Sequence, residues 1–151
     1  GRLFAGRSAA TPAEAMQAAL GALRVTRGAA VAIVALDRAA GRLRFAGVGN
    51  IAGSIVPAAE GARSQSVVSH NGIVGHQMRK VQEFDYAWPE GALLVLHSDG
   101  LATQWRLDER PGLARRDAAL VAGVLYRDWT RGRDDVTVVV ARHAARPDAA
   151  A

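Results

Sequence analysis

Two strongly apolar runs near the C-terminal end of the chain, each joined to a short acidic motif, constrain the fold more than any other feature. Residues 92–97 are continuous enough in apolar side chains to form a fully buried strand, and they lead directly into Ser98-Asp99-Gly100. Residues 136–141 form the second run and follow Asp134-Asp135. A carboxylate at the tip of a buried strand is held beside solvent, where a hard divalent cation can bind it through oxygen. The two motifs therefore predict part of a metal site.

The rest of the sequence predicts helices and antiparallel strands. Thr11-Pro12-Ala13-Glu14 has the pattern of a helix start, and apolar residues at helical spacing follow it until Gly28. A second helix is expected over 117–129. The expected strands are 29–36, 43–48, 51–56, a short run around 67–68, part of 79–88, 92–97 and 136–141. This order favours an α+β sandwich of mainly antiparallel strands over a parallel doubly wound sheet.

Length and composition fit one globular domain. The chain has 151 residues, of which 50% are hydrophobic and 22% charged. We expect the domain to span residues 1–142, followed by a flexible alanine-rich tail over 143–151. No apolar run reaches the roughly 20 residues of a membrane span, and no segment resembles a signal peptide, so the expected compartment is the cytoplasm. Because the chain has no cysteine, any metal must use oxygen or imidazole ligands.

The formal charge of +5 raises the question of nucleic-acid binding. The arginines are dispersed along an alanine-rich chain, which is more typical of a GC-rich genome than of a recognition stripe. No known nucleic-acid recognition module is visible, so binding of this kind is disfavoured, and it would require an affinity that falls steeply with salt. A basic surface that attracts a phosphorylated or acidic protein partner suits the sequence better.

Four short motifs in a fixed order carry a resemblance to a known family: Gly47-Val48-Gly49-Asn50, His70-Asn71-Gly72, Ser98-Asp99-Gly100-Leu101 and Asp134-Asp135-Val136-Thr137. Together they resemble the bacterial PPM-type (type-2C-like) serine/threonine phosphatases, and most of all the SpoIIE and RsbX branch. The resemblance extends from about residue 11 to residue 142. It implies a β-sandwich flanked by helices, with two Mn2+ or Mg2+ ions and a water between them at one edge.

The resemblance also implies roles for individual residues. Asp99, Asp134 and the backbone of Gly100 are the implied metal ligands, and Asp135 is the weaker candidate. Gly100 also lets the backbone turn tightly beside the ions. The protein would need no side-chain nucleophile, because the ions activate the attacking water. The low-ranked candidates for substrate binding are Asn50, His70, Asn71 and His76.

One family motif is absent from the sequence. The N-terminal metal motif Asp-Gly-x-Gly-His occurs nowhere in the 151 residues, and the chain begins at Gly1 without a methionine. We therefore expect the chain to be a fragment that lacks the first strands and a helix of the sandwich. The carboxylate that bridges the two ions would be missing with them.

Simpler interpretations of the same residues stay open. Ser98-Asp99-Gly100 after a strand is also an ordinary turn, because Asp and Gly favour such geometry, and Asp134-Asp135 after a glycine can be a turn as well. The pairing of the two motifs across the fold is what favours the metal site. His97 is expected to face the packing around its strand. The tryptophans at 88, 105 and 129 are expected to pack in the core or at its rim.

The predicted function of the intact protein is hydrolysis of phosphoserine or phosphothreonine on a bacterial regulatory phosphoprotein. By resemblance, this partner is a STAS-domain protein of the anti-sigma-antagonist or stressosome type in a partner-switching pathway. The alternative is a catalytically incompetent phosphatase-like module that binds a regulatory protein. The residues encoded immediately upstream of Gly1 distinguish the two, because an Asp-Gly-x-Gly-His motif there favours the enzyme.

Overall fold

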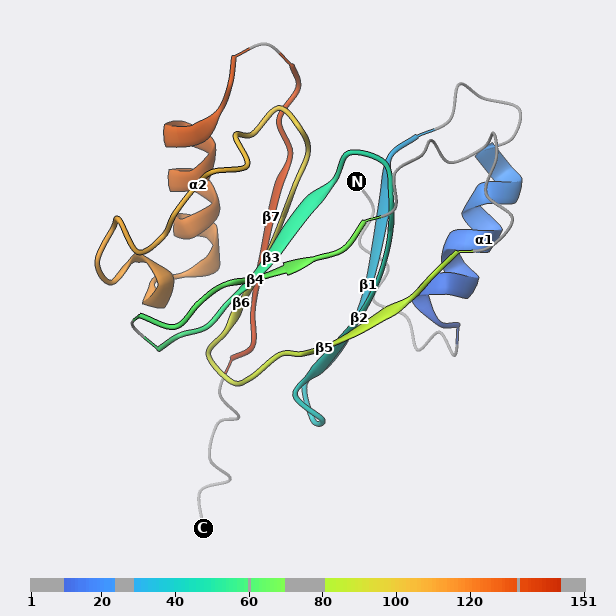
Figure 1. Cartoon of the computed structure of the whole chain (residues 1–151), viewed down its shortest axis with the longest axis horizontal. Coiled ribbons are helices and arrows are strands. Elements are labelled where there is room, and N and C mark those ends of the chain that lie inside the picture. The colour runs from blue at the N-terminus through green and yellow to red at the C-terminus, as the bar shows by residue number, and fades with distance from the viewer. Residues whose placement is uncertain (1–9, 24–28, 60, 70–80, 133, 145–151) are drawn as a thin grey trace.

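The computed structural model describes residues 10–23, 29–59, 61–69, 81–132 and 134–144, and these form four layers. Figure 1 shows helix α1 (Pro12–Leu23) and helix α2 (Ala118–Trp129) on opposite outer sides, with two β-sheets between them. All strand pairings in this part of the chain are antiparallel. The predicted α+β sandwich flanked by helices is confirmed.

The first sheet lies beside α1 and has the strand order β1-β2-β5, comprising β1 (Val31–Asp37), β2 (Arg42–Val48) and β5 (Phe84–Ala87). β1 and β2 form the predicted hairpin, in register from Val31 opposite Val48 to Asp37 opposite Arg42. The hairpin turn requires a glycine, since Gly41 has a φ of 62°. β5 then pairs with the free side of β2.

The second sheet lies beside α2 and has the strand order β4-β3-β6-β7. It comprises β4 (Gln65–Val67), β3 (Ala52–Val56), β6 (Leu93–His97) and β7 (Val138–Arg142). β6 is the predicted buried strand, and it lies between β3 and β7. His97, the last residue of β6, pairs with Val138, the first residue of β7. This register places both predicted acidic motifs at the same end of the paired strands β6 and β7. We call this end of the second sheet the acidic edge.

The core occupies the spaces between the layers. Between the sheets, the buried residues are Leu43, Phe45, Ile55, Val67, Tyr86, Trp88, Ala92 and Leu94. Leu94 faces this inner core, whereas Leu93 and Val95 face Val121 and Leu125 of α2. β6 is therefore covered on both faces, which explains its continuous apolar sequence.

Both helices begin at side-chain caps, and the sequence predicted the first of these caps. The Thr11 N–H donates to the Glu14 carboxylate (2.7 Å), and the Glu14 N–H donates to the Thr11 hydroxyl (3.2 Å), which is a capping box. In α2, the Asp117 carboxylate accepts from the Ala119 N–H (2.8 Å). A short 3-10 helix, Leu113–Arg115, precedes α2 and was not expected from the sequence.

The C-terminal end of the described chain is held in place up to His143. This residue is 7% exposed, and its ring nitrogens contact the carbonyls of Trp88 (2.7 Å) and Arg38 (3.1 Å). The flexible tail expected over 143–151 thus begins with a buried histidine, and residues 145–151 lie outside the described part of the chain. In the described residues, no helix has the length and apolar composition that a membrane crossing requires.

Candidate metal centre

Asp99 lies in the tight turn that ends the buried strand β6. The Leu101 N–H donates to the Ser98 carbonyl (3.2 Å), which closes the turn around Asp99 and Gly100. Leu101 is fully buried against the α2 side of the sheet, so both ends of the turn are anchored in the core. The side chain of Asp99 itself is exposed. The fold thus presents this carboxylate to solvent from a rigid base.

Ser98 joins this turn to the second acidic motif. Its N–H donates to the Thr137 carbonyl (3.1 Å), and its hydroxyl both donates to the Asp135 carbonyl (3.2 Å) and accepts from the Thr137 N–H (3.0 Å). These hydrogen bonds extend the pairing of β6 and β7 beyond the strand ends. The sequence did not reveal this role, because a serine after a strand is common in any turn.

Gly100 is required here by close packing rather than by its backbone angles. Its φ is not positive, so any L-amino acid could adopt its backbone angles. A Cβ at this position would lie 2.5 Å from the Asp135 carbonyl oxygen and 2.9 Å from a methyl group of Val136. The Gly100 carbonyl in turn accepts from the Arg131 N–H (2.9 Å). The turn is therefore clamped between the 135–136 backbone and the end of α2.

We expect Gly100→Ala to separate the two acidic motifs. The methyl group would meet backbone atoms that cannot rotate away, and overpacking of this kind costs about 1–3 kcal/mol. Thermal unfolding followed by circular dichroism measures the loss. Gly123→Ala is the matched control, because a Cβ there meets nothing within 4 Å and alanine favours the helix. An unchanged melting temperature in Gly100→Ala would contradict the packing described here.

Asn50 reaches the same edge from the other sheet. The chain leaves β2, turns at Gly49, whose φ is 100°, and enters β3 in the second sheet. In this crossing the side-chain amide of Asn50 donates to the Asp99 carboxylate. The predicted role of Asn50 in substrate binding stays a prediction, and the observed contact also suits a residue that orients Asp99. Such partners of a metal ligand fix its direction.

His97 and Trp105 hold the turn in place through two consecutive hydrogen bonds. The Trp105 indole N–H donates to Nε2 of His97 (3.0 Å), so the imidazole hydrogen lies on Nδ1 and is donated to the Ser98 carbonyl (2.8 Å). His97 is 3% exposed, which confirms that it faces the packing around its strand. Both ring nitrogens are engaged, and the ring holds the peptide that precedes Asp99.

Asp134 and Asp135 are both exposed on the segment that Ser98 contacts. One carboxylate oxygen of Asp134 accepts from the Asp135 N–H (2.8 Å). His70, Asn71 and His76, the other predicted site residues, lie outside the described part of the chain.

The donor chemistry of this edge suits a hard cation, because Asp99 and Asp134 offer carboxylate oxygens, which Mg2+ and Mn2+ prefer. The donor set is incomplete in the described residues, which contain no group of three or more histidine, aspartate or glutamate side chains placed to hold an ion. The described residues therefore offer only part of the donor set that the predicted metal site would need.

Comparison with known proteins gives the fold and the family. The family described as Stage II sporulation protein E (SpoIIE) matches residues 3–144. A solved chain from work on the bacterial stressosome, described as a modular system adapted to control secondary messenger signaling, is 32% identical. It superimposes with a TM-score of 0.71 over 84% of this chain and 65% of that chain.

Two further structures share the fold at lower identity. RsbX in complex with magnesium is 16% identical, with a TM-score of 0.65 over 83% of this chain and 60% of that chain. The Mn-presoaked phosphatase domain of SpoIIE from Bacillus subtilis is 22% identical, with a TM-score of 0.58 over 87% of this chain and 65% of that chain. The comparison with curated proteins found no match.

The two antiparallel sheets with helices on their outer faces are the fold of PPM-type (PP2C) phosphatase domains. Within that class, the chain belongs to the SpoIIE family, as the four sequence motifs predict. It spans 60–65% of the length of the three structures compared above.

Proposed function

We propose that the chain is part of a metal-dependent phosphatase that removes phosphate from serine or threonine on a regulatory protein. The observation that supports this proposal best is the direct contact between the turn that carries Asp99 and the segment that carries Asp134, in a member of the SpoIIE family. Asp99 stands on a turn that Ser98 and Gly100 tie directly to the segment bearing Asp134 and Asp135.

Some residues of this edge would bind the metal ions, and others orient the metal-binding side chains. Asp99 and Asp134 would each give a carboxylate oxygen to a divalent ion, and Asp135 is the weaker candidate. Asn50 holds the Asp99 carboxylate through its amide, and the Gly100 carbonyl is the candidate backbone ligand. When bound, two Mn2+ or Mg2+ ions activate a water and stabilise charge on the phosphoryl oxygens during in-line attack. No side chain has to act as a nucleophile.

The partner we propose is a phosphorylated STAS-domain protein of the anti-sigma-antagonist or stressosome type, in the cytoplasm. Support comes from the relatives, which include RsbX and a chain from work on the stressosome. The excess of 19 basic over 14 acidic residues suits the approach of a phosphorylated partner.

Hydrolysis of p-nitrophenyl phosphate by the full gene product tests the proposal. We expect turnover with Mn2+ or Mg2+ present and none after chelation by EDTA, because carboxylate-held ions supply the chemistry. Adding excess Mn2+ after chelation should restore the rate. Equal turnover in EDTA would contradict metal dependence.

A second candidate function is a phosphatase-like module that binds a regulatory protein without catalysis. The observation compatible with this module is that the described residues contain no group of three or more histidine, aspartate or glutamate side chains placed to hold an ion. A full gene product that shows no metal-dependent turnover, yet retains a protein partner, would support this module over the enzyme.

A further inference from the structure

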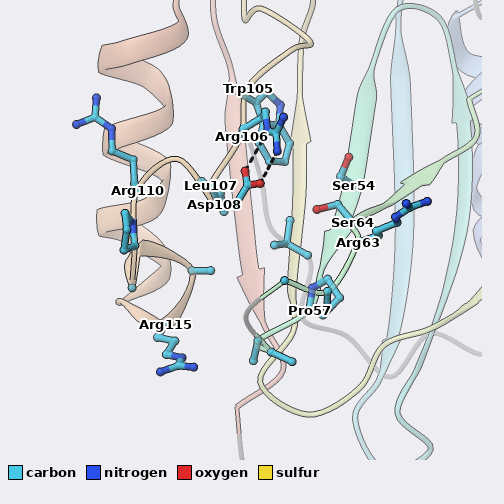
Figure 2. A pocket seen from close by; sticks show the side chains of 18 of the residues that line it. Ser54, Pro57, Arg63, Ser64, Trp105, Arg106, Leu107, Asp108, Arg110 and Arg115 are labelled. Carbon is cyan, nitrogen blue, oxygen red and sulfur yellow. Dashed lines mark hydrogen bonds and ion pairs between the residues drawn. The ribbon is translucent and has the colours of Figure 1, made fainter.

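A groove lies on the outer face of the second sheet, where α2 leaves part of that face uncovered. α2 packs mainly against β7, at one edge of the sheet, whereas β3 and β4 lie at the other edge. Residues 57–59 and 61–64, between β3 and β4, form one wall, and the 103–115 loop before α2 forms the other (Figure 2). The cavity between them has a volume of about 720 Å³. This lies within the range of about 300–1,000 Å³ that is usual for ligand sites.

The charged side chains that line this groove are mostly cationic. Among the residues that the structure describes, they are Arg63, Arg106, Arg110 and Arg115, and Asp108 is the one carboxylate. Arg63 is exposed and has no ion-pair partner among the residues that the structure describes. Asp99, Asp134 and Asp135 do not line the groove, so its charge is not balanced by the acidic edge.

Arg106 and Arg110 already have ion-pair partners, and Arg115 also has an interaction within the chain. Arg106 pairs with Asp108 (2.5 Å) and also with Glu109 (3.8 Å). The hydrogen bond from the Arg106 guanidinium lowers the pKa of the Asp108 carboxyl, so the Arg106–Asp108 pair stays ionised at neutral pH. Arg110 pairs with Asp128 (2.7 Å), which lies on α2 outside the groove. The Arg106–Asp108 pair is more than 60% exposed on both sides, and exposed pairs are weak. Arg106 can therefore exchange its partner for an external carboxylate at little cost.

The floor of the groove is apolar. Val56, Pro57 and Leu107 contribute to it, and Val56 and Leu107 are buried members of the core around α2. Trp105 is the aromatic residue in the lining, and its indole N–H is already bonded to His97. A single aromatic gives little surface for base stacking, on which single-stranded nucleic acids depend. The combination of an apolar floor with a cationic rim suits a peptide better.

We propose that this groove binds an acidic segment of a protein partner, with apolar side chains of the segment against the floor and its carboxylates against Arg63 and Arg106. The proposal goes beyond the proposed phosphatase activity, because the groove lacks the acidic residues of the candidate metal centre. It would hold the partner independently of turnover.

Fluorescence anisotropy with the full gene product tests the groove. The probe is a labelled ten-residue peptide that alternates glutamate and leucine, and the comparison peptide has lysine in place of glutamate. We expect the acidic peptide alone to bind, with an affinity that falls as salt rises. Arg63→Glu should weaken binding about fivefold to tenfold, because it replaces an attraction with a repulsion of similar size.

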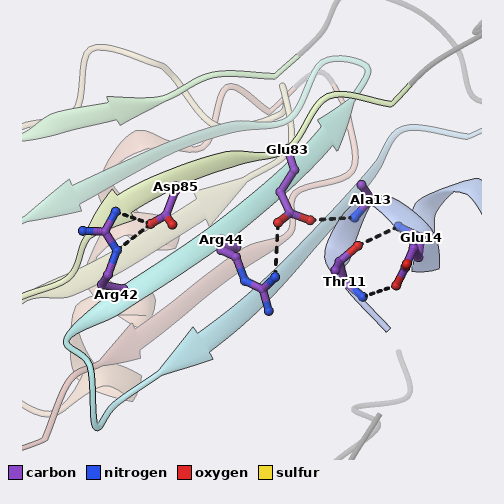
Figure 3. A network of polar contacts seen from close by, with 7 residues as sticks. All are labelled: Thr11, Ala13, Glu14, Arg42, Arg44, Glu83 and Asp85. Atoms are coloured by element: carbon purple, nitrogen blue, oxygen red, sulfur yellow. Dashed lines mark hydrogen bonds and ion pairs between the residues drawn. The ribbon is translucent and has the colours of Figure 1, made fainter. Parts of the chain in front are cut away.

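Two further variants distinguish binding in the groove from a general effect of surface charge. Ser64→Trp narrows the groove without changing its charge and should also weaken binding, since Ser64 is an exposed lining residue. Arg42→Glu makes the same charge change as Arg63→Glu, but on β2 of the other sheet, where Arg42 pairs with Asp85 (2.6 Å; Figure 3). This control should bind the acidic peptide as the wild type does.

Three outcomes would overturn the proposal. The acidic peptide fails to bind the wild type, or Arg42→Glu weakens binding as much as Arg63→Glu does. In the third, a labelled single-stranded oligonucleotide binds more tightly than the peptide and loses affinity in Arg63→Glu, which would make this a nucleic-acid groove. Because binding is measured without turnover, these results are read separately from the test of phosphatase activity.

Discussion

Replacing Asp99 with asparagine in the full gene product is expected to lower kcat/KM for Mn2+-dependent hydrolysis of p-nitrophenyl phosphate by about 100-fold or more. Loss of a residue that merely orients a metal ligand costs about 10–100-fold, and loss of a ligand should cost at least as much. The substitution keeps the size of the side chain and removes its charge. Because Asp99 is exposed and lies at the end of a well-packed strand, the fold should be retained.

Asp85→Asn is the matched control for this change. Asp85 also carries an exposed carboxylate, on β5 of the other sheet, and its partner is Arg42. It should keep the wild-type kcat/KM, and the melting temperatures of both variants should stay close to that of the wild type. Equal activity in Asp99→Asn and the wild type would remove Asp99 from the catalytic site.

Trp88→Ala is expected to destabilise the chain by about 3–5 kcal/mol, the usual cost of truncating a large buried aromatic. The Trp88 side chain is 1% exposed, lies in the core between the sheets, and stacks on the His143 ring at a centroid distance of 4.8 Å. Its removal would open a cavity and also loosen the C-terminal end of the described chain. Chemical denaturation followed by circular dichroism measures the effect.

Trp88→Phe and Val139→Ala complete this test. Trp88 Nε1 is buried and has no hydrogen-bond partner among the described residues, so phenylalanine removes an unsatisfied donor as well as some volume. It should destabilise the chain clearly less than alanine does. Val139 is 51% exposed, and Val139→Ala should change stability little. A loss below about 1 kcal/mol in Trp88→Ala would contradict the packing of this core.

The sequence predicted most of the fold because its local signals agree with the tertiary packing. The capping box at Thr11 and Glu14 forms as expected (Figure 3), and the long apolar run became a strand buried on both faces. The 103–115 loop and its short 3-10 helix were not predicted. This segment has no apolar periodicity, and its path depends on Leu107 and Leu113 reaching the core around α2.

The carboxylates of the candidate site could be predicted from the sequence, but the residues that hold them in position could not. An aspartate at each strand end is visible in the sequence, whereas the hydrogen bond from Asn50 to Asp99 joins the connection between the two sheets to a turn 49 positions later in the chain. The contact between Gly100 and the Asp135 backbone likewise exists only once β6 and β7 are paired. Spacing along the chain carries no information on such contacts.

Mn2+ binding to the full gene product, followed by electron paramagnetic resonance, tests most directly whether the Asp99 and Asp134 edge holds metal. Titration of the wild type, Asp99→Asn, Asp134→Asn and the Asp85→Asn control would compare their dissociation constants. We predict that Asp99→Asn and Asp134→Asn each raise the dissociation constant by about tenfold or more, while Asp85→Asn leaves it unchanged. Wild-type Mn2+ affinity in both Asp99→Asn and Asp134→Asn would contradict the metal-binding role of this edge.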